Sequence, residues 1–354
     1  MAKVLMKGNE VLGEAAVQAG CKYFFGYPIT PQNELVSYMA ERLPEVGGAF
    51  VQAESEVAAI NMVYGAASAG VRVMTSSSSP GVSLMQEGIS YLAGAELPAV
   101  ICNMMRGGPG LGTIQPAQSD YFQAVKGGGH GDYRLPVLAP ASLQEMVDLM
   151  ADAFDIADQY RTPVMLLGDG MMGQMMEPVE FKERPKKELP EKTWATNGVK
   201  GDGPAKSVTS LFLDPEDLER HNEHLDAKFK QIEANEVRFE SYLTEDADVI
   251  LVAYGTMARI VKNVVNKARQ NGLKAGLIRP ISLWPFPQQP FTDTVGHVKA
   301  YLTVEMSTGQ MIEDVRLAVN GKKPVYFNGR AGGMVPTQDS ILKSVEQILE
   351  GVMA

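Results

Sequence analysis

The segment Gly26–Pro31 contains the first residues whose types and spacing could do chemistry. It reads Gly-Tyr-Pro-Ile-Thr-Pro and follows the apolar, strand-like run Cys21–Phe25. Proline disfavours a helical conformation in the residue before it and suits the first position of a helix, so we expect Thr30 to cap a helix that begins at Pro31. A hydroxyl and free backbone N–H groups at the carboxyl end of a strand would bind a small anion such as a carboxylate.

Two charged side chains lie at the ends of further predicted strands. Glu56 follows the run Ala49–Gln52 and begins a helical segment, and Arg106 follows the run Ala99–Met105 and opens a glycine-rich loop. A guanidinium held at a strand end can bind a carboxylate through two parallel hydrogen bonds. Two ordinary explanations stay open at this point. Glu56 could be a solvated glutamate that favours a helix start, and Arg106 could belong to a surface ion pair.

Hydroxyl side chains are concentrated in Thr75–Gly81, between a predicted strand and a predicted helix. Groups at such a junction can contact an anion or a cofactor ring, or they can simply cap the helix. A second glycine-rich segment contains His130, and we expect it to close over a substrate. The loop after Arg106 lacks the glycine spacing of a dinucleotide fingerprint, because Pro116 interrupts the helix start. This disfavours a stand-alone nucleotide-binding protein.

One pair of polar residues has the spacing of a magnesium site, but prolines interrupt the sequence between the two residues. In thiamine-diphosphate enzymes a Gly-Asp-Gly segment, followed about 30 residues later by asparagine, binds the metal and diphosphate. Asp169 and Asn197 have this spacing. Pro178, Pro185 and Pro190 interrupt the helix and strand that such a site requires, so we expect no metal ligand in this chain.

Composition excludes several classes of function. The chain has 354 residues, with 32 Lys and Arg against 42 Asp and Glu, and its net charge of −10 argues against nucleic acid as a main partner. We find no membrane-length apolar segment and no signal-peptide pattern, and we expect a cytoplasmic protein. Cys21 and Cys102 are the only cysteines, each in a strand-like run, and we expect buried thiols. An iron–sulfur cluster usually needs about four thiolates, so this chain alone would hold none.

Residues 1–178 alternate apolar strand-like runs with helical segments, which predicts a parallel sheet covered on both faces. The predicted strands are Lys22–Phe25, Ala49–Gln52, Val71–Thr75, Ala99–Met105, Pro136–Ala139 and Pro163–Leu167. The predicted helices are Asn9–Ala19, Pro31–Leu43, Glu56–Ala69, Gly81–Ala93 and Ser142–Asp158.

Residues 179–246 predict a charged linker, and residues 247–354 predict a second doubly wound domain. Within the linker, Pro215–Tyr242 has a helical pattern with an apolar stripe. It could be an arm that packs on a partner chain or a solvated linker helix. The second domain should contain the strands Val249–Ala253, Ala275–Leu277, Tyr301–Val304 and Pro324–Phe327, and the helices Met257–Gln270, Met311–Val319 and Thr337–Leu349.

Taken together, these motifs resemble the α subunit, or pyrimidine-domain half, of the 2-oxoacid:ferredoxin oxidoreductases over essentially the whole chain. The segments that carry the resemblance are Gly26–Pro31, Glu56–Gly65, Thr75–Gly81, Arg106, Gln118–Asp120, Ala253–Thr256 and Val304–Ser307. The resemblance implies a thiamine-diphosphate pyrimidine-binding-type domain and a transketolase-C-terminal-like domain, both α/β. Gln32, Asn33 and Ser76–Ser79 look closest to the 2-oxoisovalerate (branched-chain) subfamily, with the 2-oxoglutarate subfamily next.

The resemblance also implies an activity, oxidative decarboxylation of a 2-oxo acid with coenzyme A to acyl-CoA, CO₂ and reduced ferredoxin. Thiamine diphosphate would lie at the interface with a β subunit that holds its diphosphate and Mg²⁺. [4Fe-4S] clusters would be carried by other subunits, among them γ and ferredoxin-like δ subunits, in a dimer of heteromers. The chain would be active only in that complex.

Residue roles follow from the resemblance at matching positions. Glu56 would hydrogen-bond to the aminopyrimidine ring of the cofactor, and Thr30 and Arg106 would hold the carboxylate and carbonyl of the substrate as further catalytic residues. Glu305 would pack the domains together or face coenzyme A. Further cofactor contacts would come from Tyr27, Pro28, Ile29, Ser78 and Ser79, and further substrate contacts from Gln118 and Asp120.

Several alternatives remain open from the sequence. The chain could be the β chain of a lipoamide-dependent 2-oxoacid dehydrogenase, or a non-catalytic scaffold subunit of a thiamine enzyme. An adaptable apolar pocket for a branched side chain is one explanation of Met85, Met104, Met105, Met171 and Met172, and plain core packing is the other. Lys126 and His130 could instead serve 2-oxoglutarate.

Overall fold

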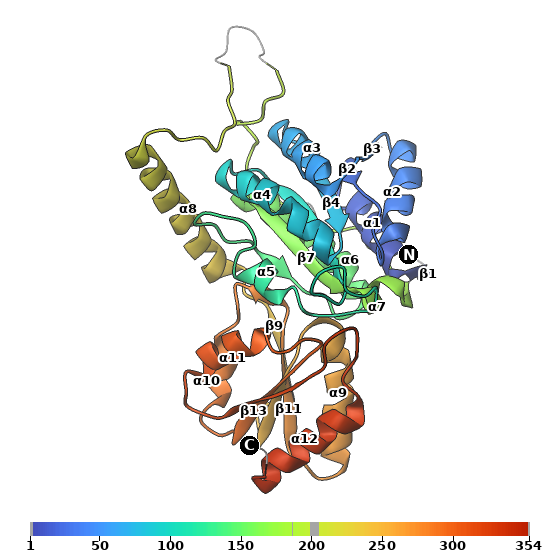
Figure 1. Cartoon of the computed structure of the whole chain (residues 1–354), viewed down its shortest axis with the longest axis vertical. Helices are drawn as coiled ribbons and strands as arrows, with labels where there is room; N and C mark the ends of the chain where they lie inside the picture. Colours follow the sequence, from blue (N-terminus) through green and yellow to red (C-terminus); the bar gives the residue numbers. More distant parts are fainter. Residues whose placement is uncertain (1–2, 186, 199–204, 353–354) are drawn as a thin grey trace.

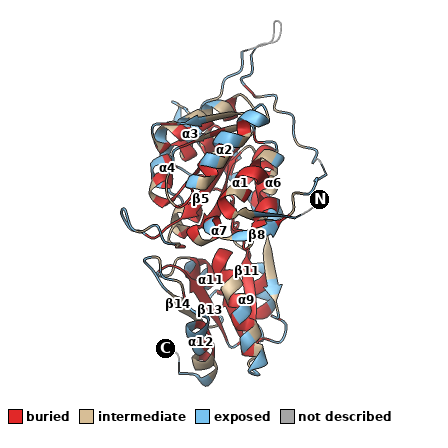
Figure 2. Cartoon of the chain, turned by 90° about the vertical axis from the view of Figure 1, so that its right-hand side faces the viewer, coloured by how far each residue is buried: buried red, intermediate tan, exposed pale blue. Residues whose placement is uncertain are grey.

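Two parallel sheets, one above the other in Figure 1, organise the chain. The computed structural model describes residues 3–185, 187–198 and 205–352. Helices cover both faces of each sheet, and the buried residues form separate layers on the two sides of each sheet (Figure 2). The two doubly wound α/β domains predicted from the sequence are confirmed.

The first sheet has seven strands in the order β12-β6-β7-β5-β4-β2-β3, all parallel to their neighbours except β12. Its strands are β2 (Tyr23–Gly26), β3 (Ala49–Gln52), β4 (Val73–Ser77), β5 (Ala99–Met105), β6 (Val137–Leu138), β7 (Pro163–Asp169) and β12 (Ser282–Trp284). The six predicted strands are therefore present. β4 and β7 each extend two residues beyond the predicted end, which brings Ser77 and Asp169 into the sheet.

Helices pack on the two faces of this sheet as separate sets. One face carries α1 (Gly8–Gln18), α2 (Asn33–Glu45) and α6 (Leu143–Tyr160). The other carries α3 (Glu56–Ser68), α4 (Ser79–Gly94) and α8 (Pro215–Asn235). Because both faces are buried, the strands read as nearly continuous apolar runs, which is why they could be predicted.

The prediction that a helix begins at Pro31 was wrong. α2 begins at Asn33, and residues before it form a turn in which the N–H of Gln32 donates to the carbonyl of Ile29 at 3.0 Å. The carbonyl of Pro31 accepts side-chain hydrogen bonds from Asn9 and Gln174, at 2.7 and 3.1 Å. Tertiary contacts with two distant segments therefore set the conformation that proline rules alone assigned to a helix.

Short elements complete the first domain and were not predicted. β1 (Val4–Lys7) pairs antiparallel with β8 (Met176–Val179) away from the main sheet. α5 (Tyr121–Val125) and α7 (Gly170–Gln174) are single turns that follow β5 and β7. Segments this short carry too few residues for a periodic pattern.

The second sheet has five strands in the order β14-β13-β10-β11-β9. Its strands are β9 (Phe239–Tyr242), β10 (Val249–Val252), β11 (Ala275–Pro280), β13 (Ala300–Glu305) and β14 (Val325–Gly329). One face is covered by α9 (Gly255–Gln270) and α12 (Gln338–Glu350), and the other by α10 (Gln289–Thr294) and α11 (Met311–Val319). The four predicted strands and three predicted helices of this region are present.

Two further strands were not predicted. Residues 239–242 were expected to continue the helical segment, but they form β9, which pairs antiparallel with β11 at the edge of the second sheet. β12 comes from residues assigned to the second domain, but it pairs antiparallel with β6 and extends the first sheet. Each domain therefore completes its sheet with a segment from the neighbouring region.

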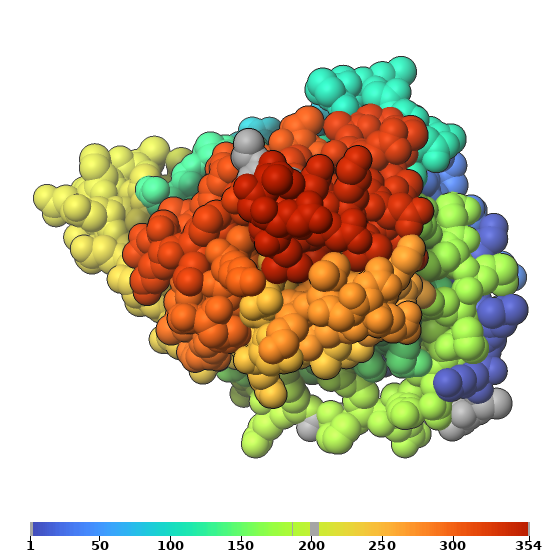
Figure 3. Space-filling model, turned by 90° about the horizontal axis from the view of Figure 1, so that it is seen from below, coloured from blue at the N-terminus to red at the C-terminus, as the bar shows by residue number. Residues whose placement is uncertain are grey.

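α8 packs on its own chain through most of its apolar stripe, so it is not a fully solvated linker helix, and packing of its other face on a partner chain stays a prediction. The helix ends at Asn235, earlier than predicted, and Leu225, Phe229 and Ile232 are buried against the first domain. A buried ion pair of 3.1 Å joins Lys228 to Glu96. In Figure 3 the region of α8, in yellow, projects from the side of the molecule, so its remaining face is open to solvent.

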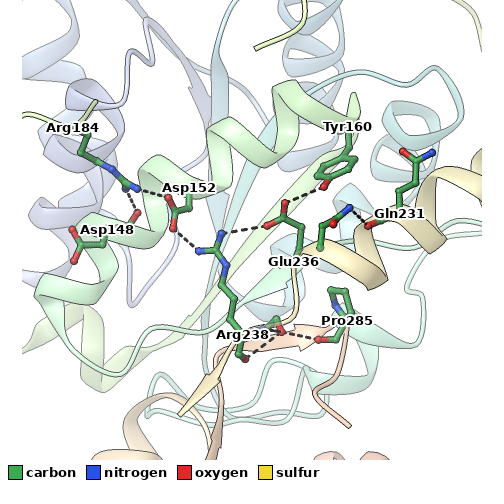
Figure 4. Close-up of polar contacts among 10 residues, drawn as sticks. Asp148, Asp152, Tyr160, Arg184, Gln231, Glu236, Arg238 and Pro285 are labelled. Carbon is green, nitrogen blue, oxygen red and sulfur yellow. Dashed lines mark hydrogen bonds and ion pairs between the residues drawn. The ribbon is translucent and has the colours of Figure 1, made fainter. Parts of the chain in front are cut away.

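The segment that leaves the first domain after β8 and the segment that follows α8 are both bound to α6 (Figure 4). Asp152 on α6 forms ion pairs with Arg184, on the outgoing segment, and with Arg238, on the returning segment. Glu236 adds bonds from Tyr160 at 3.1 Å and from Arg238 at 3.3 Å. Burial opposes the ionisation of Asp152, but the two arginines hold the pKa of its carboxyl below the usual range.

We expect Asp152→Asn to destabilise the protein by about 2 kcal/mol at pH 7, since it breaks charged hydrogen bonds to both arginines. The lowered pKa means that the carboxylate stabilises the fold above its ordinary pKa of 3.8 and loses this contribution as the pH falls below that value. The difference in urea midpoint between the variant and the wild type should therefore be constant from pH 7 to about pH 5 and shrink under acid. A pH-independent difference would show that ionisation of Asp152 contributes nothing.

Both thiols are buried, as predicted. Cys21 and Cys102 are fully enclosed, and burial raises the pKa of the Cys21 thiol to about 12. In the part of the chain that the structure describes, every helix is too short or too polar to cross a lipid bilayer.

Candidate active site

The carboxyl ends of the parallel strands of both sheets face one junction between the domains. Gln118, in the loop after β5, donates from its side-chain amide to the carbonyl of Tyr254 after β10, at 3.0 Å. It also accepts from the N–H of Met306 after β13, at 3.1 Å. Ligand sites in such folds lie at the carboxyl ends of the strands. The predicted site residues come from β2, β4 and β5 and from the start of α3, at this edge.

Glu56 is buried at the first position of α3, with 5 % of its surface exposed. Ser55 caps the helix by accepting from the N–H of Ala58 at 3.3 Å, which leaves the side chain of Glu56 free to turn inward. Its carboxylate lies against Gly81 on α4, where any Cβ would collide with Oε1. The hydroxyl of Ser77 donates to the same oxygen over a long 3.4 Å. The solvated-glutamate interpretation is therefore wrong, and this buried carboxylate keeps unused acceptor capacity.

The serines at the junction of β4 and α4 differ in their partners. Ser78 is fully buried at the cap position of α4, and its Oγ has no hydrogen-bond partner among the described residues. Ser79 has a positive φ of 23°, in a region that favours glycine. Its N–H donates to Oδ1 of Asn103 at 3.2 Å, and its hydroxyl donates to Asp120 at 2.6 Å. These bonds hold an unfavourable backbone conformation in place.

Asp120 is the centre of this network. Its Oδ2 accepts from Ser79 and also from Nδ2 of Asn103 at 3.0 Å. The hydroxyl of Ser79 in turn accepts from the N–H of Arg106 at 3.0 Å. Burial raises the pKa of the Asp120 carboxyl, although the hydrogen bonds from Ser79 and Asn103 and the charge of Arg106 oppose this shift. The network ties the start of α4 to β5 and to both ends of the loop between β5 and α5.

Arg106 is buried, with 8 % of its surface exposed, and forms no surface ion pair among the described residues. Its guanidinium donates to the carbonyl of Thr30 at 2.9 Å and to the carbonyl of Leu111 at 3.3 Å. The Nε–H is buried with no partner among the described residues. Arg106 thus joins the glycine-rich loop to the turn of Thr30 and retains a free donor.

The turn before α2 presents its predicted cofactor residues to solvent. Tyr27 and Pro28 are exposed, and Ile29 and Thr30 are half-buried. Gln32 anchors the turn from below: it is fully buried, accepts from the Ser76 hydroxyl at 2.6 Å and donates weakly to the carbonyl of Tyr27 at 3.5 Å. An exposed edge beside the buried Glu56 is suited to a ligand shared with another protein surface.

A cavity of about 680 Å³ opens at the junction. Ser79 and Asp120 line it from the first domain, and Ser307, Thr308 and Gln310 line it from the second. The glycine-rich loop after Arg106 forms another wall, at Gly107–Gly110. Among the site residues predicted from the sequence, only Ser79 and Asp120 contribute to these walls.

Gln118 does not line this cavity. It is fully buried, and both ends of its amide connect the two domains. Its backbone N–H adds a bond of 2.8 Å to the carbonyl of Met306. Its position supports a role in domain packing rather than the substrate contact expected from the resemblance.

We expect Gln118→Leu to destabilise the protein by about 2–4 kcal/mol, because it leaves the carbonyl of Tyr254 and the N–H of Met306 buried without partners. Gln123→Leu on α5 is the matched control: that side chain makes a single bond, to Ser83, at 2.9 Å. Urea unfolding measures both variants. Equal midpoints would contradict the role of Gln118 in the junction.

Glu305 packs the second domain internally. Its carboxylate accepts the N–H groups of Gln310, Met311 and Ile312 at 3.0–3.1 Å and the Ser307 hydroxyl at 3.0 Å, at the start of α11. It is fully buried and does not line the cavity. These partners all belong to the second domain, so its hydrogen bonds stabilise the start of α11 rather than join the two domains.

None of the other candidate residues lines this cavity. The backbone carbonyl of His130 accepts from the Ser90 hydroxyl at 2.7 Å and its ring contacts Tyr91, late in α4; closure of this loop over a substrate stays a prediction. Lys126 forms an ion pair with Asp314. Met85, Met104, Met105 and Met172 are buried in core clusters on both faces of the sheet, which favours core packing.

Asp169 lies at the carboxyl end of β7, whereas Asn197 follows a segment bound at the end of α3. Asp169 caps α7 by accepting from the N–H groups of Met171 and Met172, at 2.9 and 3.2 Å. The segment before Asn197 is bound at the far end of α3, where the N–H of Thr196 donates to the carbonyl of Ser68. The metal spacing in the sequence therefore does not bring the two residues together.

Asn103 is the site residue that the sequence did not reveal. It is fully buried on β5, and it connects Ser79 to Asp120. The sequence signal that could have revealed it is a single amide side chain in an otherwise apolar strand, because a buried amide needs polar partners.

Comparisons with known proteins show the family to which the chain belongs. Residues 14–239 match the family described as pyruvate flavodoxin/ferredoxin oxidoreductase, thiamine diP-bdg, and residues 247–341 match the pyruvate:ferredoxin oxidoreductase core domain II. The ketoisovalerate oxidoreductase subunit VorB of Methanothermobacter marburgensis is 51% identical over 98% of both chains. The 2-oxoglutarate synthase subunit KorA of Methanothermobacter thermautotrophicus is 36% identical over 96% of this chain and 97% of its own.

Solved structures show the same architecture. The 2-oxoglutarate:ferredoxin oxidoreductase from Magnetococcus marinus, solved with 2-oxoglutarate, coenzyme A and succinyl-CoA bound, has a TM-score of 0.87 at 27% identity. The match covers 98% of this chain and 65% of that one. A split gene transketolase, at 15% identity and a TM-score of 0.61, shares the fold over 98% of both chains. The chain therefore belongs to the 2-oxoacid:ferredoxin oxidoreductases, as an α-type subunit.

Proposed function

We propose that this subunit supplies the half-site at which a branched-chain 2-oxo acid, 2-oxoisovalerate or a close analogue, is oxidatively decarboxylated to acyl-CoA. The single observation that carries the proposal is Glu56, a carboxylate buried at the carboxyl edge of the sheet with little use inside its own chain. The exposed turn at Tyr27 beside it supports a cofactor shared with a partner subunit.

The residues present fit the pyrimidine half of thiamine diphosphate. Glu56 offers a free acceptor, Ser78 offers a buried hydroxyl without a partner among the described residues, and Gly81 leaves room that a Cβ would fill. Glu56 would accept a hydrogen bond from the aminopyrimidine ring, with Tyr27 and Ile29 against the ring. When bound, the cofactor supplies the electron sink for loss of CO₂.

Arg106 and Thr30 would hold the substrate. The Nε–H of Arg106 is an unused donor in a buried position, where a charge-assisted bond to a carboxylate is strong. The same guanidinium fixes the carbonyl of Thr30, so one side chain would set the position of the hydroxyl of Thr30 relative to the substrate. Asp120, whose burial raises its pKa, would position Ser79 and Arg106 through their shared hydrogen bonds.

The cavity between the domains would admit the acyl acceptor. The relative from Magnetococcus marinus was solved with coenzyme A bound, and a cavity of about 680 Å³ lies next to Ser79 in this chain. We infer partners that supply the rest of the chemistry: a β subunit for the diphosphate and Mg²⁺, and γ and ferredoxin-like δ subunits, with [4Fe-4S] clusters that reduce ferredoxin. The two buried cysteines of this chain support clusters held elsewhere.

Two observations support a branched-chain substrate. The relative at 51% identity is a ketoisovalerate oxidoreductase subunit, whereas the 2-oxoglutarate synthase subunits are 34–40% identical. Lys126, a candidate cation for a second carboxylate, is paired with Asp314.

Steady-state rates of the complex purified with its native partner subunits test the proposal. We expect kcat/KM for 2-oxoisovalerate to exceed the values for pyruvate and 2-oxoglutarate by at least about tenfold. A difference of this size is what one or two methylene groups of the substrate contribute when they bind in an apolar pocket. A higher value for 2-oxoglutarate would assign the chain to the other subfamily, and no CoA-dependent turnover of any 2-oxo acid would refute the function.

A further inference from the structure

The turn that carries Thr30 is held by side chains from two helices that the site description does not include. Asn9, in the first turn of α1, is fully buried, and its Nδ2 donates to the carbonyl of Pro31 at 2.7 Å. Gln174, at the end of α7, donates to the same carbonyl at 3.1 Å. Both residues lie far from Pro31 in sequence, so only the fold brings them to the turn.

Glu34 closes this arrangement into a ring of hydrogen bonds. Its carboxylate accepts from Nδ2 of Asn9 at 2.8 Å and from Nε2 of Gln174 at 2.9 and 3.0 Å. Both hydrogens of the Asn9 amide are therefore used, one on the turn and one on Glu34. Burial opposes the ionisation of Glu34, but these bonds and the nearby Lys7 hold the pKa of its carboxyl below the usual range.

Close packing makes the position of Asn9 rigid. At Gly8 a Cβ would collide with the carbonyl of Met172, so α1 and α7 touch through backbone atoms. The Oδ1 of Asn9 points at Gly173 and has no hydrogen-bond partner among the described residues. A buried amide oxygen without a partner costs stability. An apolar side chain at this position would avoid that cost. The amide is therefore needed for its two N–H groups, which donate to Pro31 and Glu34.

We propose that Asn9 is a positioning residue of the site: with Gln174, it holds the carbonyl of Pro31 and thereby sets the place of the Thr30 hydroxyl against the substrate. The inference rests on the proposed function. Two consecutive carbonyl groups of the turn are then held, because Arg106 donates to the carbonyl of Thr30 and Asn9 donates to the carbonyl of Pro31. A shift of about 1 Å in such a group can cost about a hundredfold in rate.

Asn9→Asp is the informative variant, because it keeps the shape and removes both donors. The groups that face it are Glu34 and Lys7, with Glu10 bound to the backbone N–H of Lys7. We expect KM for the 2-oxo acid to rise roughly ten- to hundredfold at pH 8 with a smaller change in kcat. Burial beside the Glu34 carboxylate should raise the pKa of the introduced carboxyl group. The defect should therefore shrink as the pH is lowered from 8 to 6, because the protonated carboxyl group can donate again. A purely structural role would give no such pH profile.

Gln18→Glu is the matched control on the same helix. It makes the same change from amide to carboxylate beside a glutamate, since Gln18 donates to Glu14 at 2.6 Å, but it lies about 13 Å along the helix from Asn9. Wild-type KM is expected. Gln174→Glu tests the same carbonyl from an exposed position, where folding is not at risk, and we expect a few-fold rise in KM.

Hydrogen exchange of the assembled complex supplies a readout apart from activity. Peptides that span the turn and the start of α2 should exchange faster in Asn9→Asp and Gln174→Glu than in the wild type or in Gln18→Glu. Unchanged exchange together with unchanged KM in Gln174→Glu, or an Asn9→Asp defect that does not vary with pH, overturns the inference. A wild-type complex that turns over no 2-oxo acid would instead refute the proposed function, and the exchange result would still decide whether Asn9 holds the turn.

Discussion

Glu56→Gln should lower kcat of the assembled complex by about 10²–10⁴-fold, the range expected when a positioned proton-transferring group is lost. The substitution keeps the volume and the burial of the side chain, so the complex should still assemble with its partner subunits. What it removes is the carboxylate, whose Oε1 accepts only the long bond from Ser77 among the residues that the structure describes. A glutamine amide can turn either end towards the cofactor but cannot accept and stabilise a proton.

Glu54→Gln is the control for this substitution. Glu54 is two residues earlier and exposed, so the same chemical change there should leave turnover as in the wild type. Complex assembly is checked by gel filtration and rates by CoA-dependent reduction of ferredoxin. Turnover within a few-fold of the wild type in Glu56→Gln would mean that the buried carboxylate does not activate the cofactor. It would also revive the scaffold-subunit alternative.

Arg106→Lys should raise KM for the 2-oxo acid about ten- to hundredfold, since an ammonium cannot replace the fork of donors. The guanidinium reaches the carbonyl of Thr30 and the carbonyl of Leu111 at once and retains its Nε–H. Lysine keeps the positive charge but supports one of these contacts at a time. The expected loss is therefore in substrate binding and loop order, with a smaller loss in kcat.

Arg134→Lys provides the comparison, because Arg134 is exposed on the surface and away from the junction. Steady-state kinetics with 2-oxoisovalerate separate KM from kcat for both variants. If Arg106→Lys leaves KM unchanged, the substrate carboxylate is bound by another residue. If it lowers kcat and KM together, the guanidinium acts on the bound substrate rather than on its capture.

Residue patterns along the chain are enough to predict the two α/β domains and the strand ends near which Glu56, Ser79 and Arg106 lie. Strands buried on both faces are long apolar runs, and each run ends where polar residues and glycine begin, so local composition is enough to locate them. The family resemblance rests on the same segments, because the residues at strand ends are the ones that carry chemistry.

The contacts that hold those residues in place come from the packing of segments that are distant in sequence. Pro31 was expected to begin a helix, but its carbonyl is bound by Asn9 and Gln174, which are remote in sequence. Gln118 was expected at the substrate, but it joins the two domains. Local rules describe the preferences of one segment, whereas a buried polar group must be satisfied by whichever distant segment the packing brings to it.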